Sequence, residues 1–319
     1  MRRALCVGID LYPFGSLRGC VSDADRMSGL LAKHDDGSPN FDCRKITAPD
    51  GGGNDVVTRT KLKQAVEQLF KDKADVALLH FSGHGTENNL GGYLVTQDAK
   101  TYDEGVAMSD VLKMANDSKA EEVVIFLDCC YAGNLGNVPV VDNAKTLLRE
   151  GVSILTASRA AQVSVEVGGG GLFTSLVADA LEGGAADLLG EVAVPAIYSF
   201  VETALGAWDQ RPLFKSHVSK VIPLRKCKPP IEITTLRELP KLFPVPAEDL
   251  PLTPEYEASC EKKDDEKNKV FCKLQSLSRV HLVVPVGVPH MYDAAMQSKA
   301  CCLTAAGRYY WRLANDSRI

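Results

Sequence analysis

Short apolar runs alternate with amphipathic stretches over residues 1–225. The runs at 4–9, 76–81, 123–127, 152–156 and 218–224, with a weaker one at 43–47, have the length and apolar character of buried parallel strands. Between them, apolar residues recur at spacings of three and four, which predicts helices over 25–34, 60–71, 109–118, 173–181 and 194–205. This alternation predicts an α/β fold, doubly wound, with a mostly parallel sheet between layers of helices. Residues 93–97 predict a small hairpin.

The pattern changes at Lys226. Prolines crowd residues 229–254 and helical periodicity is weak there, so we predict an extended linker over 226–254. Residues 255–319 predict a small accessory or regulatory module, with a charged helix in 255–273, a strand near 280–288 and an aromatic-rich helix over 303–313. The rings of that last helix need a cover from their own module, from the rest of the chain or from a partner. The expected organisation is therefore a domain at 1–225, a linker and a C-terminal module.

Composition narrows the class of protein. The chain has 319 residues, 45% of them apolar, which is enough to bury a sizeable core in more than one domain. A net charge of −5 gives no electrostatic footprint for nucleic acid. The 10 cysteines lack the regular spacing of a disulfide framework, and no apolar run approaches membrane-spanning length. We expect a cytoplasmic protein with neither a nucleic-acid nor a membrane partner.

Two polar motifs follow two of the predicted strands. Ser-Gly-His-Gly lies at 82–85 and Asp-Cys-Cys-Tyr-Ala-Gly at 128–133. Because the carboxyl ends of parallel strands meet at one edge of a sheet, His84 and Cys130 should lie close together. A cysteine needs a neighbouring base to become a thiolate nucleophile, which makes His84 the candidate base and Cys130 the nucleophile. The backbone N–H groups of Gly85 and Cys130 are candidate donors to an oxyanion.

Packing is the alternative interpretation of each motif. A lone cysteine after an apolar strand is usually a core residue. A histidine between two glycines is harder to explain by packing, because glycines mark special backbone geometry. Together the two motifs favour a peptidase.

Over residues 2–225 the chain resembles the caspase-like cysteine peptidases of the metacaspase and paracaspase kind. The motifs of that resemblance occur in the expected order at 3–9, 17–24, 82–85, 126–133, 154–159, 171–174 and 210–212. It implies a caspase-like fold and a catalytic dyad of His84 and Cys130, since the family pattern is Asp-x-Cys followed by x-x-Gly. Cys129 takes the position usually held by serine, and Tyr131 stands where many relatives carry histidine.

The same resemblance implies an S1 pocket for the P1 side chain of the substrate, lined by Cys20, Asp23, Ser82 and Asp128. Two carboxylates in one cavity can accept a guanidinium in a fork geometry and would repel an aspartate. We therefore predict cleavage of proteins or peptides after arginine or lysine. Two alternatives stay open: Asp23 as the N-cap of the helix that follows it, and Asp128 as a partner of local backbone groups.

The loop 133–151 follows the nucleophile, and the corresponding region of caspase-like enzymes is often cut during maturation. Its two basic residues, Lys145 and Arg149, are the candidate processing sites of a zymogen, whereas Asp142 would be the site under an aspartate preference. An uncut surface loop is the alternative. An activating peptidase or a regulatory protein is therefore a possible further partner.

We expect no metal and no cofactor. The glycine clusters at 51–53 and 168–171 lack nucleotide-binding spacing, although the second could frame a substrate groove. Cys260, Cys272, His281 and His290 lack the paired spacing of a zinc site. The resemblance to metacaspases, many of which depend on calcium, leaves activation by calcium open, although no EF-hand spacing occurs in this sequence. A catalytically silent caspase-like scaffold and a non-proteolytic thiol hydrolase or transferase are the alternative functions.

Overall fold

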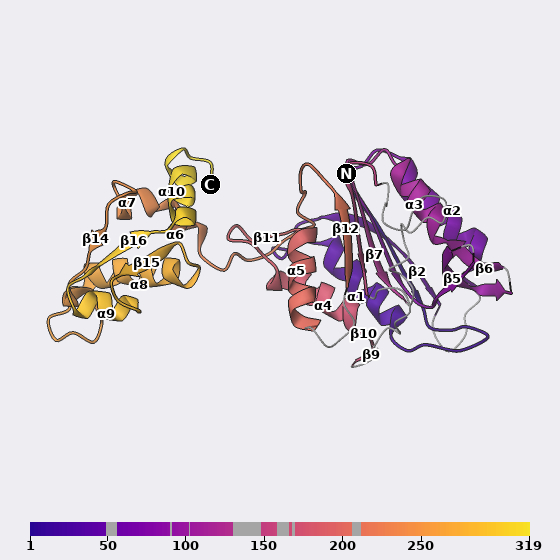
Figure 1. Cartoon of the computed structure of the whole chain (residues 1–319), viewed down its shortest axis with the longest axis horizontal. Helices are drawn as coiled ribbons and strands as arrows, with labels where there is room; N and C mark the ends of the chain where they lie inside the picture. The colour runs from indigo at the N-terminus through magenta and orange to yellow at the C-terminus, as the bar shows by residue number, and fades with distance from the viewer. Residues whose placement is uncertain are drawn as a thin grey trace. The chain divides into compact units, whose positions relative to one another are not determined.

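The computed structural model describes residues 1–48, 56–89, 91–101, 103–129, 148–157, 166–167, 170–205 and 212–319 (Figure 1). They form two compact units. The first comprises Met1–Ala186 and Glu191–Lys228, and the second comprises Asp187–Gly190 and Pro229–Ile319.

The first unit is built on a six-stranded sheet in the order β12-β8-β7-β3-β1-β2. Its strands are β1 (Arg2–Ile9), β2 (Phe41–Ala48), β3 (Val76–Ser82), β7 (Glu122–Asp128), β8 (Val152–Thr156) and β12 (Leu213–His217). The first five are parallel to one another, and β12 pairs with β8 in the antiparallel direction at the edge. Every residue of β3 and β7 is buried, as continuous apolar strands in the middle of a two-faced sheet require.

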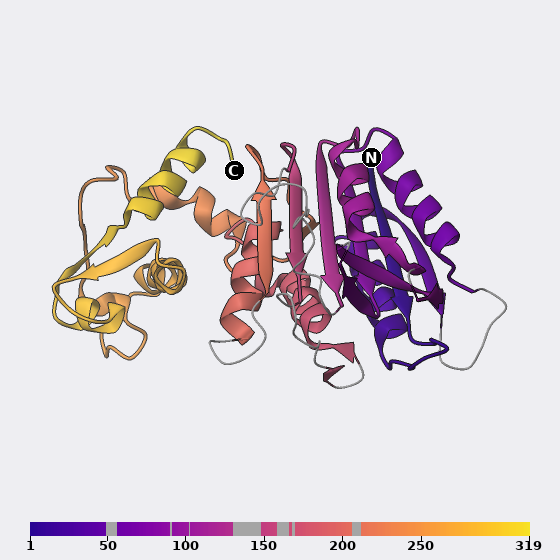
Figure 2. The same cartoon turned by 45° about the vertical axis from the view of Figure 1, so that its right-hand side comes forward.

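Helices cover both faces of this sheet (Figures 1 and 2). On one face Leu5, Val7 and Ile9 of β1 pack in a core with α2 and α3, and on the other Ala4 and Cys6 pack in a core with α1, α4 and α5. The helices are α1 (Cys20–Ala32), α2 (Arg59–Lys71), α3 (Met108–Asn116), α4 (Leu172–Asp179), which continues into the π-helix η2 (Ala180–Gly184), and α5 (Val194–Leu205). The predicted α/β fold with a mostly parallel sheet between helices is thus confirmed.

Three small sheets complete the unit. They are β4-β5-β6, formed by β4 (Gly85–Asn88), β5 (Gly91–Lys100) and β6 (Asp103–Ala107), the pair β9 (Glu166–Val167) and β10 (Gly170–Gly171), and the pair β11 (Glu191–Val192) and β13 (Arg225–Lys226). The hairpin predicted near 93–97 is therefore part of a three-stranded sheet.

The predicted strand at 218–224 is wrong. The last strand of the main sheet is β12, which begins at Leu213, five residues before the predicted start. Its residues are half-buried or exposed. An edge strand pairs on one side only and does not need a continuous apolar run.

The second unit has its own core. Its elements are α6 (Ile233–Arg237), α7 (Leu239–Leu242), β14 (Leu250–Pro251), η3 (Pro254–Tyr256), α8 (Asp265–Arg279), β15 (Val283–Val286), α9 (Met291–Met296), β16 (Ala300–Leu303) and α10 (Ala305–Asn315). The three strands pair in the order β14-β16-β15. Leu188 and Leu189, which lie between η2 and β11 in the sequence, pack against this core.

The extended linker predicted over 226–254 is wrong for residues 229–254. They form α6, α7 and β14, and they bury apolar side chains in the core of the second unit, namely Ile231, Leu236, Leu239, Phe243 and Leu252. The indole Nε1–H of Trp311 on α10 donates to the carbonyl of Phe243 at 2.7 Å. Part of the aromatic face of α10 is therefore covered by its own unit.

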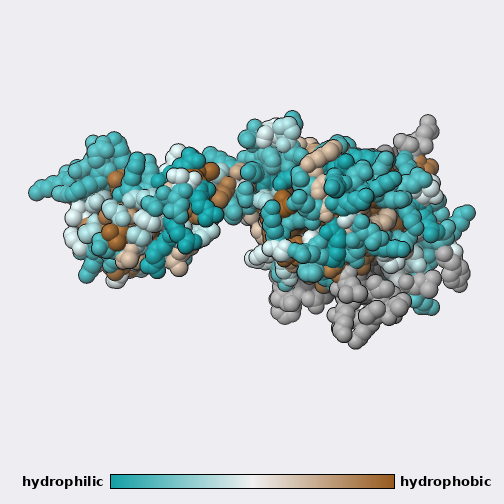
Figure 3. Space-filling view, turned by 90° about the horizontal axis from the view of Figure 1, so that it is seen from above, coloured by the Kyte–Doolittle hydropathy of each residue, from teal (hydrophilic) through white to brown (hydrophobic). Residues whose placement is uncertain are grey.

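The face shown in Figure 3 is dominated by hydrophilic residues in both units, and hydrophobic residues appear there in small separate patches. Among the described residues, no helix is both long and apolar enough to span a membrane.

Candidate active site

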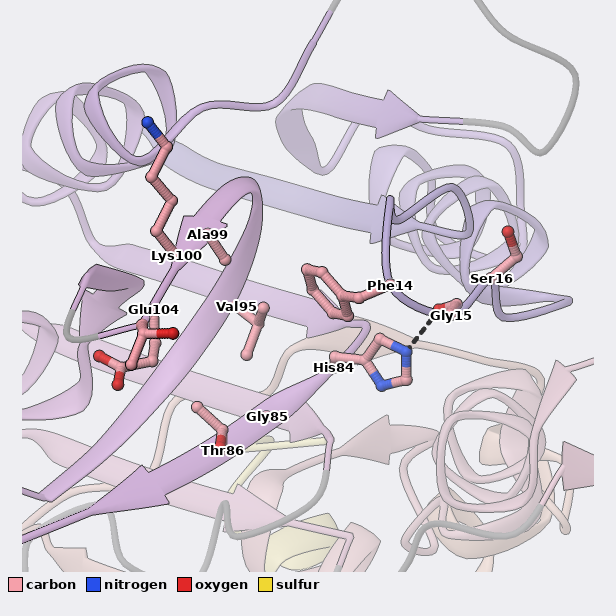
Figure 4. A pocket seen from close by; sticks show the side chains of 11 residues that line it. Phe14, Gly15, Ser16, His84, Gly85, Thr86, Val95, Ala99, Lys100 and Glu104 are labelled. Atoms are coloured by element: carbon pink, nitrogen blue, oxygen red, sulfur yellow. Dashed lines mark hydrogen bonds between the residues drawn. The ribbon is translucent and has the colours of Figure 1, made fainter.

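His84 lies just beyond the carboxyl end of β3, and its ring orientation is fixed by the chain near Gly15. The ring Nε2 lies 2.8 Å from the carbonyl oxygen of Gly15 (Figure 4). Because a carbonyl only accepts hydrogen bonds, a neutral His84 carries its proton on Nε2 and keeps a lone pair on Nδ1. The Nδ1 atom points away from Gly15 (Figure 4) and is the atom that can take up a proton.

Tyr12 holds the backbone of His84 in place. The amide N–H of His84 donates to the Tyr12 hydroxyl at 3.0 Å, and the hydroxyl lies 3.4 Å from the carbonyl of Val95. Burial raises the pKa of Tyr12, so the hydroxyl stays protonated and can serve both partners. The two rings are 4.7 Å apart. A Cβ at Gly83 would lie 2.6 Å from the hydroxyl, which explains the glycine before His84.

A cavity of about 620 Å³ opens beside His84 (Figure 4). Phe14, Gly15 and Ser16 line it from the chain after β1, and Gly85 and Thr86 line it from β4. The remaining lining residues come from β5, from the residue after it and from β6, namely Val95, Ala99, Lys100, Thr101 and Glu104. Phe14 is 56% exposed and its ring lies 5.9 Å from that of His84. The cavity thus pairs an apolar wall near the imidazole with charged side chains at its far end.

Cys130, the predicted nucleophile and oxyanion donor, lies outside the described residues, as does Lys145. Cys129, the residue before Cys130, is buried and follows β7 directly. Ser82, the last residue of β3, is in register with Asp128, the last residue of β7. The strands that precede the two motifs therefore end side by side, as the sequence predicted.

Asp23 is a buried carboxylate in the first turn of α1. It accepts a hydrogen bond from the Ser82 hydroxyl at 2.8 Å and from the N–H of Gly171, 3.1 and 3.2 Å from its two oxygens. Burial, added to by the nearby charge of Asp128, raises the pKa of Asp23 to about 7. The alternative of Asp23 as an N-cap is wrong, because Gly19 holds that position.

Asp128 is bound by the first turn of α4. Its Oδ2 accepts from the backbone N–H of Thr174 at 3.1 Å and from the Thr174 hydroxyl at 2.8 Å. The alternative that Asp128 satisfies backbone groups is thus partly right, although the groups belong to a distant helix. A Cβ at Gly170 would lie 2.7 Å from Asp23 Oδ1, and a Cβ at Gly171 would lie 2.0 Å from Asp128 Oδ2. Glycine is therefore needed where β10 passes the two carboxylates.

Cys20 begins α1, and its backbone N–H donates to Asp10 at 2.8 Å. Burial raises the pKa of its thiol well above the usual range, so it stays a neutral thiol. The structure thus places Cys20 and Asp23 in the first turn of α1, and it brings Asp23, Ser82 and Asp128 together at the ends of β3 and β7. No local pattern in the sequence indicates the roles of Tyr12 and Thr174 or the hydrogen bond from Gly171 to Asp23, because each depends on packing between distant segments.

Arg149, a predicted processing site, is tied to the body of the first unit. Its guanidinium donates to the backbone carbonyls of Ala115, Ala120 and Glu150 at 3.3, 2.8 and 2.6 Å, and its own N–H donates to Asn116 at 3.0 Å. This side chain is a structural anchor at the end of α3, and in this arrangement it cannot enter an S1 pocket.

Within the part of the chain that the structure describes, no group of three or more His, Cys, Asp or Glu side chains is arranged to hold a metal ion. Cys260, Cys272, His281 and His290 are among the described residues and form no such group.

Residues 1–223 match a family model described as the caspase domain. The chain belongs to the caspase-domain peptidases. Metacaspase-2 of Trypanosoma brucei brucei is 30% identical over 155 residues, 43% of this chain and 43% of that protein. Metacaspase-3 of Arabidopsis thaliana is 25% identical over 156 residues, 44% of this chain and 42% of that protein. The chain therefore aligns with less than half the length of these caspase-domain relatives.

Two solved structures share the fold. Caspase-1 of Spodoptera frugiperda has a TM-score of 0.51 and 13% identity, covering 71% of this chain and 90% of that chain. Protein GSU0716 of Geobacter sulfurreducens has a TM-score of 0.52 and 17% identity, covering 71% of this chain and 99% of that chain. At this identity they support the caspase fold alone.

Proposed function

We propose that this caspase-domain chain is a cysteine endopeptidase that cleaves proteins after arginine or lysine, with Cys130 as nucleophile and His84 as base. The observation that carries the proposal is the pair of buried carboxylates, Asp23 and Asp128, 5% and 4% exposed, where β3 and β7 end. Asp128 stands two residues before Cys130 and Ser82 two residues before His84, so the pocket and the dyad share the same strand ends.

His84 is arranged for the base. With its proton on Nε2 facing Gly15, Nδ1 takes the proton of the Cys130 thiol. The thiolate adds to the scissile carbonyl, and the N–H groups of Gly85 and Cys130 stabilise the oxyanion. His84 then returns the proton to the departing amine, leaving a thioester on Cys130. Water, deprotonated by His84, hydrolyses the thioester and restores the free thiol.

The charge of the pocket favours a basic P1 side chain. A guanidinium or ammonium beside Asp23 stabilises the ionised carboxylate and lowers its pKa from about 7, so binding is expected to release a proton near neutral pH. An aspartate in the same place would add a third negative charge to a buried site.

The cavity beyond His84 is assigned to the leaving side of the substrate. The group that protonates the leaving amine must stand on that side of the scissile bond. Phe14 and Val95 then offer apolar contact to the first residues after the cut, and Lys100 lies farther along.

The test is hydrolysis of matched fluorogenic peptides that end in arginine, lysine, citrulline or aspartate. We expect turnover of the arginine and lysine peptides, and slower turnover of the citrulline peptide, whose side chain has the shape of arginine without its charge. All of it should be lost in Cys130→Ala and in His84→Ala. Runs with calcium and with a chelator decide whether calcium activates the enzyme. Turnover of the aspartate peptide would overturn the pocket assignment, and no turnover by intact or nicked protein would favour a silent scaffold.

We also propose that the chain is made as a zymogen cut within 133–151, by itself or by an activating peptidase. The anchored guanidinium of Arg149 makes Lys145 the favoured site. Mass spectrometry of the purified enzyme beside the Cys130→Ala variant locates the cut and shows whether it is autocatalytic.

A further inference from the structure

We infer that His80 and Thr174 form a hydrogen-bond relay that orients Asp128 for a basic P1 side chain, which makes both of them positioning residues for specificity. This inference rests on the proposed function, because Asp128 matters here as a wall of the S1 pocket. His80 lies on β3 two residues before Ser82, and Thr174 lies in the first turn of α4.

The relay is a continuous chain of short contacts. His80 Nε2 lies 3.1 Å from the Thr174 hydroxyl, which lies 2.8 Å from Asp128 Oδ2. The same oxygen accepts the backbone N–H of Thr174 at 3.1 Å. All three side chains are almost fully buried, at 0%, 1% and 4% exposure. Water therefore has little access with which to replace these contacts.

The protons of the relay follow from counting donors. An ionised Asp128 can only accept, so the single hydroxyl proton of Thr174 points to it. The proton between Thr174 and His80 must then come from His80 Nε2–H, with Nδ1 unprotonated. Burial supports this neutral form, because it lowers the pKa of His80 to about 3.

The second ring nitrogen of His80 shows that a histidine at this position has a cost. Within the described residues, His80 Nδ1 is buried and has no hydrogen-bond partner. A buried polar atom without a partner destabilises the fold, and a phenylalanine, which has no ring nitrogen, would avoid this loss of stability. The N–H at the other end of the ring is what a phenylalanine could not supply.

Orientation of Asp128 matters because a guanidinium binds a carboxylate best in a coplanar fork. Without the His80 donor the Thr174 hydroxyl is free to turn away, and Asp128 then keeps only the backbone N–H as a partner from this residue. The carboxylate plane is less fixed, and recognition of the charged P1 group weakens before the chemistry at Cys130 does.

The experiment compares Thr174→Val with Thr174→Ser, and His80→Phe with His80→Gln, whose amide can place an N–H near the position of Nε2. For the arginine peptide, we expect Thr174→Val to lose about tenfold to a hundredfold in kcat/KM, mostly through KM, and His80→Phe to lose less. Thr174→Ser and His80→Gln should retain most of the activity. Turnover of the citrulline peptide should change little in all four.

An equal loss on the arginine and citrulline peptides would overturn the relay, since a structural defect lowers both. So would an unchanged ratio between the two substrates in Thr174→Val. If this variant does not fold, as judged by thermal unfolding, the His80 pair gives the same comparison.

Failure of the proposed function is recognised separately. If the wild-type protein hydrolyses no peptide, calorimetry with benzamidine tests the relay without turnover. Weaker benzamidine binding in Thr174→Val and His80→Phe, but not in Thr174→Ser, supports the relay. Equal binding by all variants, or no binding by the wild type, overturns it.

Discussion

At the scale of single residues, Asp23 is the group whose burial has a measurable consequence. Its pKa is raised to about 7 in the folded protein, against an ordinary value near 3.9 in the unfolded chain. The folded state therefore binds a proton that the unfolded state releases between about pH 4 and pH 7. The contribution of this group to stability is present below that window and is lost as the pH rises through it.

Replacing Asp23 by asparagine should remove this loss. We expect Asp23→Asn to be more stable than the wild type at pH 8, by roughly 1–3 kcal/mol, and the difference to shrink toward pH 4. Urea unfolding at several pH values measures it. Asp25→Asn, which removes an exposed carboxylate of the same helix paired with Lys45, is the matched control. A difference that does not vary with pH would contradict the buried-acid interpretation.

Arg149 and Lys145 are expected to respond differently to substitution. Arg149→Gln removes the guanidinium that binds three carbonyls near the end of α3, and should lower the Tm of the first unit by about 2–6 °C. Lys145→Gln should leave Tm unchanged and abolish the cut within 133–151. Thermal unfolding and mass spectrometry of both variants check this. A cut that persists in Lys145→Gln and is lost in Arg149→Gln would contradict the assignment.

At the scale of elements, the start of α1 is packed directly on β1. A Cβ at Gly8 would lie 2.1 Å from the carbonyl oxygen of Cys20 and 2.9 Å from Ala24. We expect Gly8→Ala to push away the turn that carries Asp23, with a loss of about 2 kcal/mol or more in stability and reduced turnover of the arginine peptide.

Gly29 of α1 is the matched control for Gly8. It is exposed, and a Cβ there would meet no atom within 4 Å. Gly29→Ala should stabilise the protein by about 0.5–1 kcal/mol through helix propensity alone. Denaturant unfolding of the pair measures both effects. Similar stability of the two variants would show that α1 can move away from β1 without strain.

The elements also show what a sequence pattern can predict. The buried strands β1, β3, β7 and β8 were predictable because a central strand needs a continuous apolar run. The edge strand β12 was misplaced because a half-exposed strand has no such signal. Residues 229–254 were misjudged because proline is also accepted in the first turn of a helix, as Pro240 is in α7.

The site shows the same limit. His84 could be predicted because it stands in a motif directly after an apolar strand, whereas Asp23, Ser82 and Asp128 were implied by the resemblance to caspase-like peptidases. Thr174 lies 46 residues from Asp128, and Tyr12 lies 72 residues from His84. Such contacts are set by how helices pack on the sheet, and they leave no local pattern in the sequence.

At the scale of the whole molecule, the two units have separate cores but are interleaved in sequence. The cores of the first unit use buried residues only up to Cys227. The core of the second unit runs from Ile231 to the C-terminal region, yet Leu188 and Leu189 also pack against it. The second unit thus includes Asp187–Gly190, a segment that precedes the last part of the first unit, Glu191–Lys228, in the sequence.

This arrangement predicts two unfolding transitions for the full chain, and a specific defect on shortening it. A chain ending at Lys228 keeps both cores of the first unit and should retain most of its peptide hydrolysis. It also leaves Leu188 and Leu189 without the core that covers them, so we expect it to self-associate. Replacing both leucines by serine should restore a monomer with unchanged turnover, as measured by light scattering and kinetics. Loss of hydrolysis in this shortened, monomeric protein would instead place the second unit in the catalytic machinery.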